Sequence, residues 1–293
     1  MTHRARTRRL GLAALVVAFG ATLGLTACEP APPDTYVALG DSYAAGPLIP
    51  NQSTSPLGCL RSSSNYANVA KASIKAATFK DVSCSGAQTD DFFAAQDVTP
   101  GPANPAQLTA VDARTKVVTL TVGGNDIGFT DIVKNCAVSL PWDAGCKGDY
   151  VHDGRDELSE KIAAVGAPLD RVLAGIKQRA PKAKGFVVGY PTVLPETGTG
   201  CYPTVPILPD DVVYLRAKVK ELNALLKSRA LAAGMTYVDV ATPSIGHDFC
   251  AGSAKWVEGL VPTNVAAPVH PNAAGMRATG ATVAAAINRV VTS

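Results

Sequence analysis

Five short apolar segments, separated by helical or polar sequence, constrain the fold of this 293-residue chain more than any other feature. Their apolar, β-branched character with little alternation is typical of central strands covered on both faces, although the second segment is weaker than the others. The segments are residues 35–39, 78–82, 116–122, 185–188 and 236–240. Apolar residues spaced three and four apart predict helices over 158–176, with a kink or break at Pro168, over 212–226, and from near Pro271 to 290. This order predicts an α/β fold with a mostly parallel sheet and helices on both faces.

Four polar, glycine-rich motifs stand where loops leave the first three predicted strands or enter the last predicted helix. They are Gly40-Asp41-Ser42-Tyr43, Cys84-Ser85-Gly86-Ala87, Gly123-Gly124-Asn125-Asp126 and His270-Pro271-Asn272. In such a sheet the carboxyl ends of the strands meet at one edge, where the active site lies. We therefore expect these four motifs to lie together.

The residue types in these motifs suit acyl transfer. A serine such as Ser42 needs a base, here His270, to take its proton, and donors to stabilise the oxyanion that forms. The Ser42 N–H, the Gly86 N–H and the Asn125 side chain supply three such donors. Taken singly, Ser42 also fits a helix N-cap, and His270 fits a cap beside a helix-starting proline.

The motifs and their order resemble those of the SGNH (GDSL-type) hydrolases, in the secreted actinobacterial lipase and esterase branch. The resemblance rests on VALGDSYAAG, CSGAQT, LTVGGNDIGF and HPNAAG, and it covers almost all of the chain after residue 28. It implies a flavodoxin-like three-layer α/β/α sandwich, with a single hydrolase domain over residues 35–293. It also implies that Ser42 and His270 are catalytic, that Ser42, Gly86 and Asn125 form the oxyanion hole, and that no metal or cofactor is needed.

The sequence departs from that family at the group that orients the histidine. Many members carry an aspartate three residues before it, but here that position is Ala267. We expect the backbone carbonyl of Ala267 or Pro268 to replace the carboxylate and leave a Ser–His dyad. Asp248 is the alternative, which would complete a triad.

The first 27 residues have the pattern of an export signal. Four arginines precede residue 10, and residues 10–25 form an apolar run too short for a comfortable membrane span. The run ends in Leu-Thr-Ala before Cys28, which looks like the lipobox of bacterial lipoproteins, so we expect lipidation of Cys28 and a tether over 28–34. The alternative is an ordinary cleavage site beside a cysteine, and the choice between Sec and twin-arginine export stays open.

The net charge and the cysteine count differ between the whole chain and the part that begins at Cys28. Removing residues 1–27 takes away four arginines and no acid, which changes the net charge from +3 to −1 and gives no electrostatic reason to expect a nucleic-acid partner. With Cys28 set aside, six of the seven cysteines remain, in an oxidising compartment. Fifteen pairings are possible. We favour the sequential set Cys59–Cys84, Cys136–Cys146 and Cys201–Cys250, which closes local loops and which the resemblance also implies.

Together these features predict a serine ester hydrolase, a lipase or esterase and possible phospholipase, that acts on a small-molecule or lipid ester. A glycan O-deacetylase of the same fold is the alternative within the family. A surface lipoprotein that only binds a ligand is the non-enzymatic alternative. We expect an exported monomer, either anchored by its lipid to the outer face of the cytoplasmic membrane or secreted.

Overall fold

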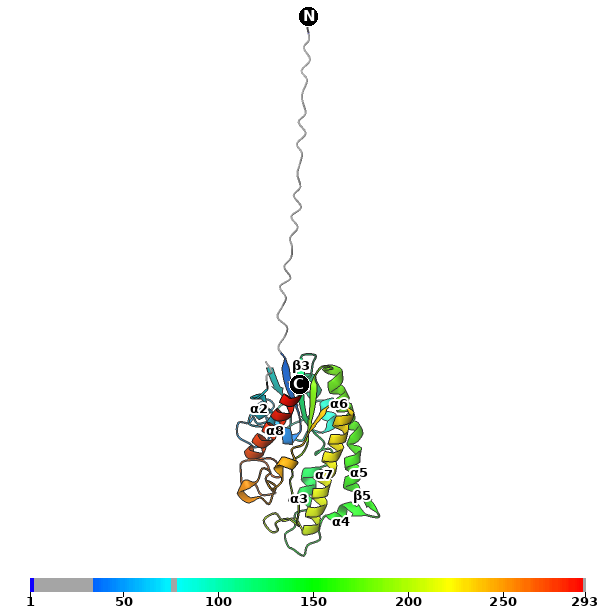
Figure 1. Cartoon of the computed structure of the whole chain (residues 1–293), viewed down its shortest axis with the longest axis vertical. Helices are drawn as coiled ribbons and strands as arrows, with labels where there is room; N and C mark the ends of the chain where they lie inside the picture. Colours follow the sequence, from blue (N-terminus) through cyan, green and yellow to red (C-terminus); the bar gives the residue numbers. More distant parts are fainter. Residues whose placement is uncertain (3–33, 75–77, 292–293) are drawn as a thin grey trace. The chain divides into compact units, whose positions relative to one another are not determined.

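The structure is a computed structural model that describes residues 1–2, 34–74 and 78–291. Apart from residues 1–2, the predicted signal peptide lies outside the described residues, as do Cys28 and the tether up to residue 33. The described residues from 34 onward belong to one compact unit, Pro33–Ser293 (Figure 1). No helix in the described part is long and apolar enough to cross a membrane.

A five-stranded parallel sheet in the order β2-β1-β3-β6-β7 forms the centre of this unit. Its strands are β1 (Thr35–Gly40), β2 (Thr78–Asp81), β3 (Thr115–Thr121), β6 (Lys184–Val188) and β7 (Thr236–Val238). All five predicted strands are present within two residues of their expected ends. The order is that of flavodoxin-like folds, with the direction of winding reversed between β1 and β3. The predicted fold class is therefore confirmed.

The pleat of the sheet divides its side chains between two apolar cores. In β1, the side chains of Tyr36 and Ala38 enter one core, and those of Val37 and Leu39 enter the other. Every residue of β1 is buried. This explains why the strand reads as a continuous apolar run, since both of its faces need apolar side chains.

Helices cover both faces, as the sequence predicts (Figure 1). Apolar residues of α5 (Glu157–Ala164), α6 (Gly166–Arg179) and α7 (Pro209–Ala232) line one core, and those of α2 (Tyr66–Lys71) and α8 (Ala273–Val291) line the other. The remaining elements are α1 (Ser42–Ala45), α3 (Phe129–Asn135), α4 (Lys147–Tyr150) and a hairpin of β4 (Val151–His152) and β5 (Arg155–Asp156). Five short 3₁₀ turns join them, Leu57–Cys59, Thr89–Phe92, Gln107–Ala110, Thr242–Ser244 and Gly252–Ala254.

The break predicted at Pro168 occurs earlier in the chain. α5 ends at Ala164 and α6 begins at Gly166, so Pro168 is the third residue of the second helix. A proline in the first turn removes an N–H that has no partner within the helix, so it is tolerated there. Pro168 therefore lies just inside the start of a new helix and does not kink a continuous one.

Three disulfides join Cys59 to Cys84, Cys136 to Cys146 and Cys201 to Cys250. This is the sequential pairing preferred from the sequence. The first of them connects the loop after α1 to the loop after β2, next to the carboxyl edge of the sheet.

Candidate active site

Ser42 lies at the point where β1 turns into the short helix α1. Asp41 caps this helix, since its Oδ1 accepts a hydrogen bond from the Tyr43 N–H at 2.9 Å. Gly40 adopts a φ of +139°, and a Cβ there would lie 2.5 Å from the carbonyl oxygen of Thr121. Only glycine therefore lets β1 pack closely against β3 and turn sharply enough to place Ser42 at the sheet edge.

His270 reaches Ser42 from the loop before α8. Its Nε2 lies 2.7 Å from the Ser42 Oγ, and its Nδ1 lies 2.7 Å from the carbonyl oxygen of Pro268. A carbonyl oxygen only accepts, so the Nδ1 carries the proton and the Nε2 is free to accept from the serine hydroxyl. The structure brings nucleophile and base together in the tautomer that proton transfer needs.

Three groups had been considered for orienting His270, and the structure separates them. The Pro268 carbonyl faces the imidazole, whereas the Ala267 carbonyl accepts the backbone N–H of His270 at 3.3 Å. The Oδ1 of Asp248 accepts the backbone N–H of Cys250 at 2.9 Å. Asp248 thus contributes to the loop that carries a disulfide cysteine, as expected for a structural residue.

The turn that aims the Pro268 carbonyl is strained at Val269. Its φ of +64° lies in the left-handed region, where a β-branched residue is a real outlier. Two hydrogen bonds hold it there. The Tyr43 hydroxyl donates to the Val269 carbonyl at 2.6 Å, and the Val269 N–H donates to the carbonyl of Gly259 at 3.2 Å. Strain of this kind persists where the surroundings over-determine the conformation, and it clusters at active sites.

The motifs that contain Gly86 and Asn125 meet beside Ser42. The Cys84 N–H donates to the Gly40 carbonyl at 2.9 Å, and the Asn125 Nδ2 donates to the Ala87 carbonyl at 3.0 Å. The second bond uses one of the two Asn125 amide hydrogens. Asn125 and Ser42 also line the same narrow cavity.

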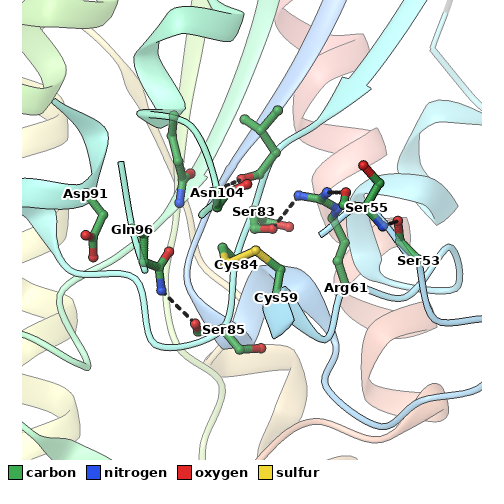
Figure 2. The surroundings of a disulfide bond; sticks show 12 residues. Ser53, Ser55, Cys59, Arg61, Ser83, Cys84, Ser85, Asp91, Gln96 and Asn104 are labelled. Atoms are coloured by element: carbon green, nitrogen blue, oxygen red, sulfur yellow. Dashed lines mark hydrogen bonds between the residues drawn. A yellow bond between two sulfur atoms is a disulfide. The ribbon is translucent and has the colours of Figure 1, made fainter. Parts of the chain in front are cut away.

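The backbone N–H groups proposed as oxyanion donors are unoccupied. Among the residues that the structure describes, neither the Ser42 N–H nor the Gly86 N–H donates to another group. Together with the second Asn125 hydrogen, three donors are thus available at this edge of the sheet. Figure 2 shows the disulfide Cys59–Cys84 directly before the Gly86 loop.

Sequence reasoning missed Tyr190. Its hydroxyl donates to the Asp41 Oδ2 at 2.5 Å and accepts the Gly124 N–H at 2.7 Å. Tyr190 therefore links the residue before Ser42 to the residue before Asn125. The signal available in the sequence was its position, two residues after the end of β6 at the active edge of the sheet.

Burial shifts the ionisation of two groups at the site. It lowers the pKa of His270, an effect that the bond to Pro268 opposes. It raises the pKa of Asp41 to about 7, against the hydrogen bonds from Tyr190 and the Tyr43 N–H. His270 is consequently neutral at neutral pH, which is the state a general base requires.

The acid limb of the pH profile is expected to lie below the ordinary histidine pKa of about 6.5. His270 is the candidate base, and burial lowers its pKa, so the neutral imidazole persists to lower pH. The measurement is kcat/KM of a soluble ester against pH. An acid limb near pH 7 that disappears in Asp41→Asn would contradict this and assign the limb to Asp41.

Between residues 34 and 291, apart from 75–77, no group of three or more His, Cys, Asp or Glu side chains is arranged to hold a metal ion.

The chain is similar to known lipases in sequence. The model of the GDSL-like Lipase/Acylhydrolase family matches residues 38–278. Lipase 2 of Streptomyces coelicolor is 39% identical over 262 residues, which cover 88% of this chain and 87% of that protein.

Solved structures show the same similarity. The extracellular lipase of Streptomyces rimosus superposes with a TM-score of 0.70 at 31% identity, over 86% of this chain and 98% of that one. Phospholipase A1 of Streptomyces albidoflavus superposes with a TM-score of 0.71 at 27% identity, over 87% of this chain and 99% of that one.

Proposed function

The chain belongs to the GDSL-like lipase/acylhydrolase family, and we propose that it is a serine ester hydrolase in which Ser42 and His270 form the catalytic dyad. Membership of this family and its lipase and esterase relatives make it a carboxylic ester hydrolase. The observation that carries the dyad is the 2.7 Å contact between the Ser42 Oγ and the His270 Nε2, with the Nδ1 held by a backbone carbonyl.

In the first half of the reaction the Ser42 Oγ attacks the ester carbonyl carbon, and the His270 Nε2 takes the hydroxyl proton. The C–O bond to the alcohol then breaks as His270 returns this proton to the leaving oxygen. An acyl-enzyme remains on Ser42. In the second half water attacks the acyl carbon and gives a proton to the His270 Nε2. The bond between the acyl carbon and the Ser42 Oγ then breaks, His270 returns the proton to the Oγ, and the carboxylic acid leaves.

The oxyanion of each tetrahedral intermediate is stabilised by the Ser42 N–H, the Gly86 N–H and the Asn125 amide. These donors are in place before the substrate arrives, because the motifs that carry them are fixed by hydrogen bonds to β1 and to one another. Preorganised donors of this kind lower the barrier without reorganising during the reaction.

Acyl esters of lipids, or short synthetic esters, are the proposed substrates. The cavity beside Ser42 and Asn125 is lined largely by apolar groups, but its volume of about 10 Å³ is that of a single water molecule, so the support for lipid esters comes from the relatives. The apolar and aromatic side chains among them are Tyr43, Phe129, Tyr190, Val193, Val219 and Leu222. The similar proteins named lipase and phospholipase A1 support the same class.

Covalent labelling of the whole exported chain with a fluorophosphonate tests the proposal. We expect one label on the wild-type protein, located on the peptide that contains Ser42, and none on Ser42→Ala. A folded wild-type protein that takes no label would overturn the proposal and favour a ligand-binding lipoprotein. A series of p-nitrophenyl esters of increasing chain length, compared with an acetylated glycan, then separates a lipase or esterase from a glycan O-deacetylase.

Export belongs to the same proposal. The three disulfides suit an oxidising compartment outside the cytoplasm. The related lipase of Streptomyces rimosus is described as extracellular. Residues 1–27 then act as the signal peptide and Cys28 as the lipid-bearing first residue of the mature protein. Mass spectrometry of the mature N-terminal peptide checks this, and an unmodified Cys28 contradicts it.

A further inference from the structure

The side chain of Gln96 points to Ser85, the residue before Gly86 (Figure 2). Its Nε2 donates to the carbonyl oxygen of Ser85 at 2.9 Å, and its side chain is buried, with a residue exposure of 9%. It belongs to a separate segment, which is held by two backbone hydrogen bonds between Gln96 and Asn104 at 2.8 and 2.9 Å. These backbone bonds hold the segment in place independently of the side-chain hydrogen bond from Gln96 to Ser85.

The bond acts on the peptide group that contains the proposed oxyanion donor. The Ser85 C=O and the Gly86 N–H belong to one planar trans peptide, so they point in opposite directions. A contact that fixes the direction of the oxygen therefore fixes the direction of the N–H as well. Gly86 has a φ of +82° and no side chain, so little else about this residue restrains the rotation of the peptide plane.

The neighbouring contacts hold the loop around this peptide and leave its orientation to Gln96. The Ala87 N–H donates to the Cys84 carbonyl at 3.1 Å and closes a turn, but such a turn forms with its central peptide in either of two orientations. Before it, Cys84 is joined to Cys59, and the Ser85 N–H donates to the Cys59 carbonyl at 3.0 Å. After it, the Ala87 carbonyl accepts from Asn125. Within residues 34–74 and 78–291 the Ser85 carbonyl accepts a hydrogen bond from Gln96 alone.

We propose that Gln96 is a positioning residue of the ester hydrolase, which aims the Gly86 N–H at the oxyanion by holding the carbonyl of Ser85. The inference rests on the proposed function. Among the described residues, the Gln96 side chain hydrogen-bonds to Ser85 and to neither Ser42 nor His270. The oxyanion forms only after the substrate has bound, so the Gln96 side chain stabilises the transition state and not the bound substrate. Removing this side chain therefore lowers kcat and leaves KM nearly unchanged.

The test is the steady-state kinetics of Gln96→Met, which keeps the length of the side chain and removes the donor. We expect kcat on a soluble p-nitrophenyl ester to fall about tenfold, a fraction of the 10²- to 10³-fold loss typical when an oxyanion donor is removed. KM should change less than about twofold. The rate of fluorophosphonate labelling should fall by the same factor as kcat, because the phosphoryl oxygen occupies the oxyanion position.

Asn104→Ala is the matched control. Asn104 pairs with Gln96 through the backbone, but its Nδ2 donates at 3.4 Å to the carbonyl of Val82, not to the Gly86 loop. It should keep wild-type kcat even if it lowers the melting temperature. If Gln96→Met fails to fold, Gln96→Asn serves, since it keeps the amide but is one methylene too short to reach Ser85.

The possible outcomes are distinct. Wild-type kcat in a folded Gln96 variant, a rise in KM in place of a fall in kcat, or an equal loss in Asn104→Ala overturns the positioning role. None of these touches the proposed function, provided that the wild-type protein is labelled and Ser42→Ala is not. Absence of label on the wild-type protein fails the proposed function itself.

Discussion

Replacing His270 by alanine is expected to reduce kcat on a soluble ester by a factor on the order of 10⁴ to 10⁶. Among the residues that the structure describes, the imidazole is the only group hydrogen-bonded to the Ser42 Oγ that can take its proton, and the hydroxyl is a weak nucleophile without it. The measurement is the steady-state hydrolysis of a p-nitrophenyl ester, with circular dichroism to show that the variant is folded.

Asp248→Asn is the control that decides between a dyad and a triad. The asparagine oxygen still accepts the Cys250 N–H, so the variant keeps the contact that Asp248 makes in the structure. Because Pro268 orients the imidazole, kcat should stay within about twofold of wild type, as is usual for a residue outside the reacting set. A loss as severe as that of His270→Ala would show that the carboxylate is the true partner of the histidine.

Replacing Asn125 by alanine is expected to lower kcat by about 10²- to 10³-fold with a small effect on KM. The amide is a donor to charge that develops only as the tetrahedral intermediate forms, so its loss raises the barrier more than it weakens substrate binding. Asn125→Asp, which keeps the shape and replaces the NH₂ by a second oxygen, should be at least as impaired. The measurements are kcat and KM on the same soluble ester.

Asn125→Ala has two effects, because the Asn125 amide also donates a hydrogen bond to the Ala87 carbonyl. The substitution removes the oxyanion donor and also loosens the contact with the loop that contains Gly86 and Ala87. Gln88 provides the comparison. Its Nε2 donates to the backbone carbonyl of Asn125 at 3.2 Å, so Gln88→Ala loosens the same contact between loops and leaves the amide in place. We expect kcat within a few-fold of wild type. Near-normal kcat in Asn125→Ala would remove Asn125 from the oxyanion hole.

The central strands β1, β3 and β6 could be predicted because each is short, apolar and almost wholly buried, so that its sequence carries a strong local signal. The edge strands β2 and β7 are only partly buried, and the signal of β2 is correspondingly weaker. The positions of the motifs followed from chain order, since parallel strands bring their carboxyl ends to one edge. Ser42, Gly86, Asn125 and His270 could be named on that basis and on the resemblance. The structure brings Ser42 to His270 and Ala87, next to Gly86, to Asn125.

The contacts that refine this site could not be predicted, because no local sequence pattern specifies them. Tyr190 lies 149 residues from Asp41, and no spacing in the sequence links the two. Gln96 has no local pattern that would distinguish it from a surface residue. The choice of Pro268 over Ala267 depends on a left-handed conformation at Val269, which β-branched residues rarely adopt.

The backbone carbonyl at Pro268 has a consequence for how this enzyme can vary. An aspartate that orients a histidine is lost by a single nucleotide change, but no change of side chain removes a carbonyl oxygen. Position 267 therefore does not need an acidic side chain, provided that the turn through Val269 is kept. Selection therefore acts on the backbone conformation of this turn, which hydrogen bonds to Tyr43 and Gly259 stabilise, and not on the identity of one orienting residue.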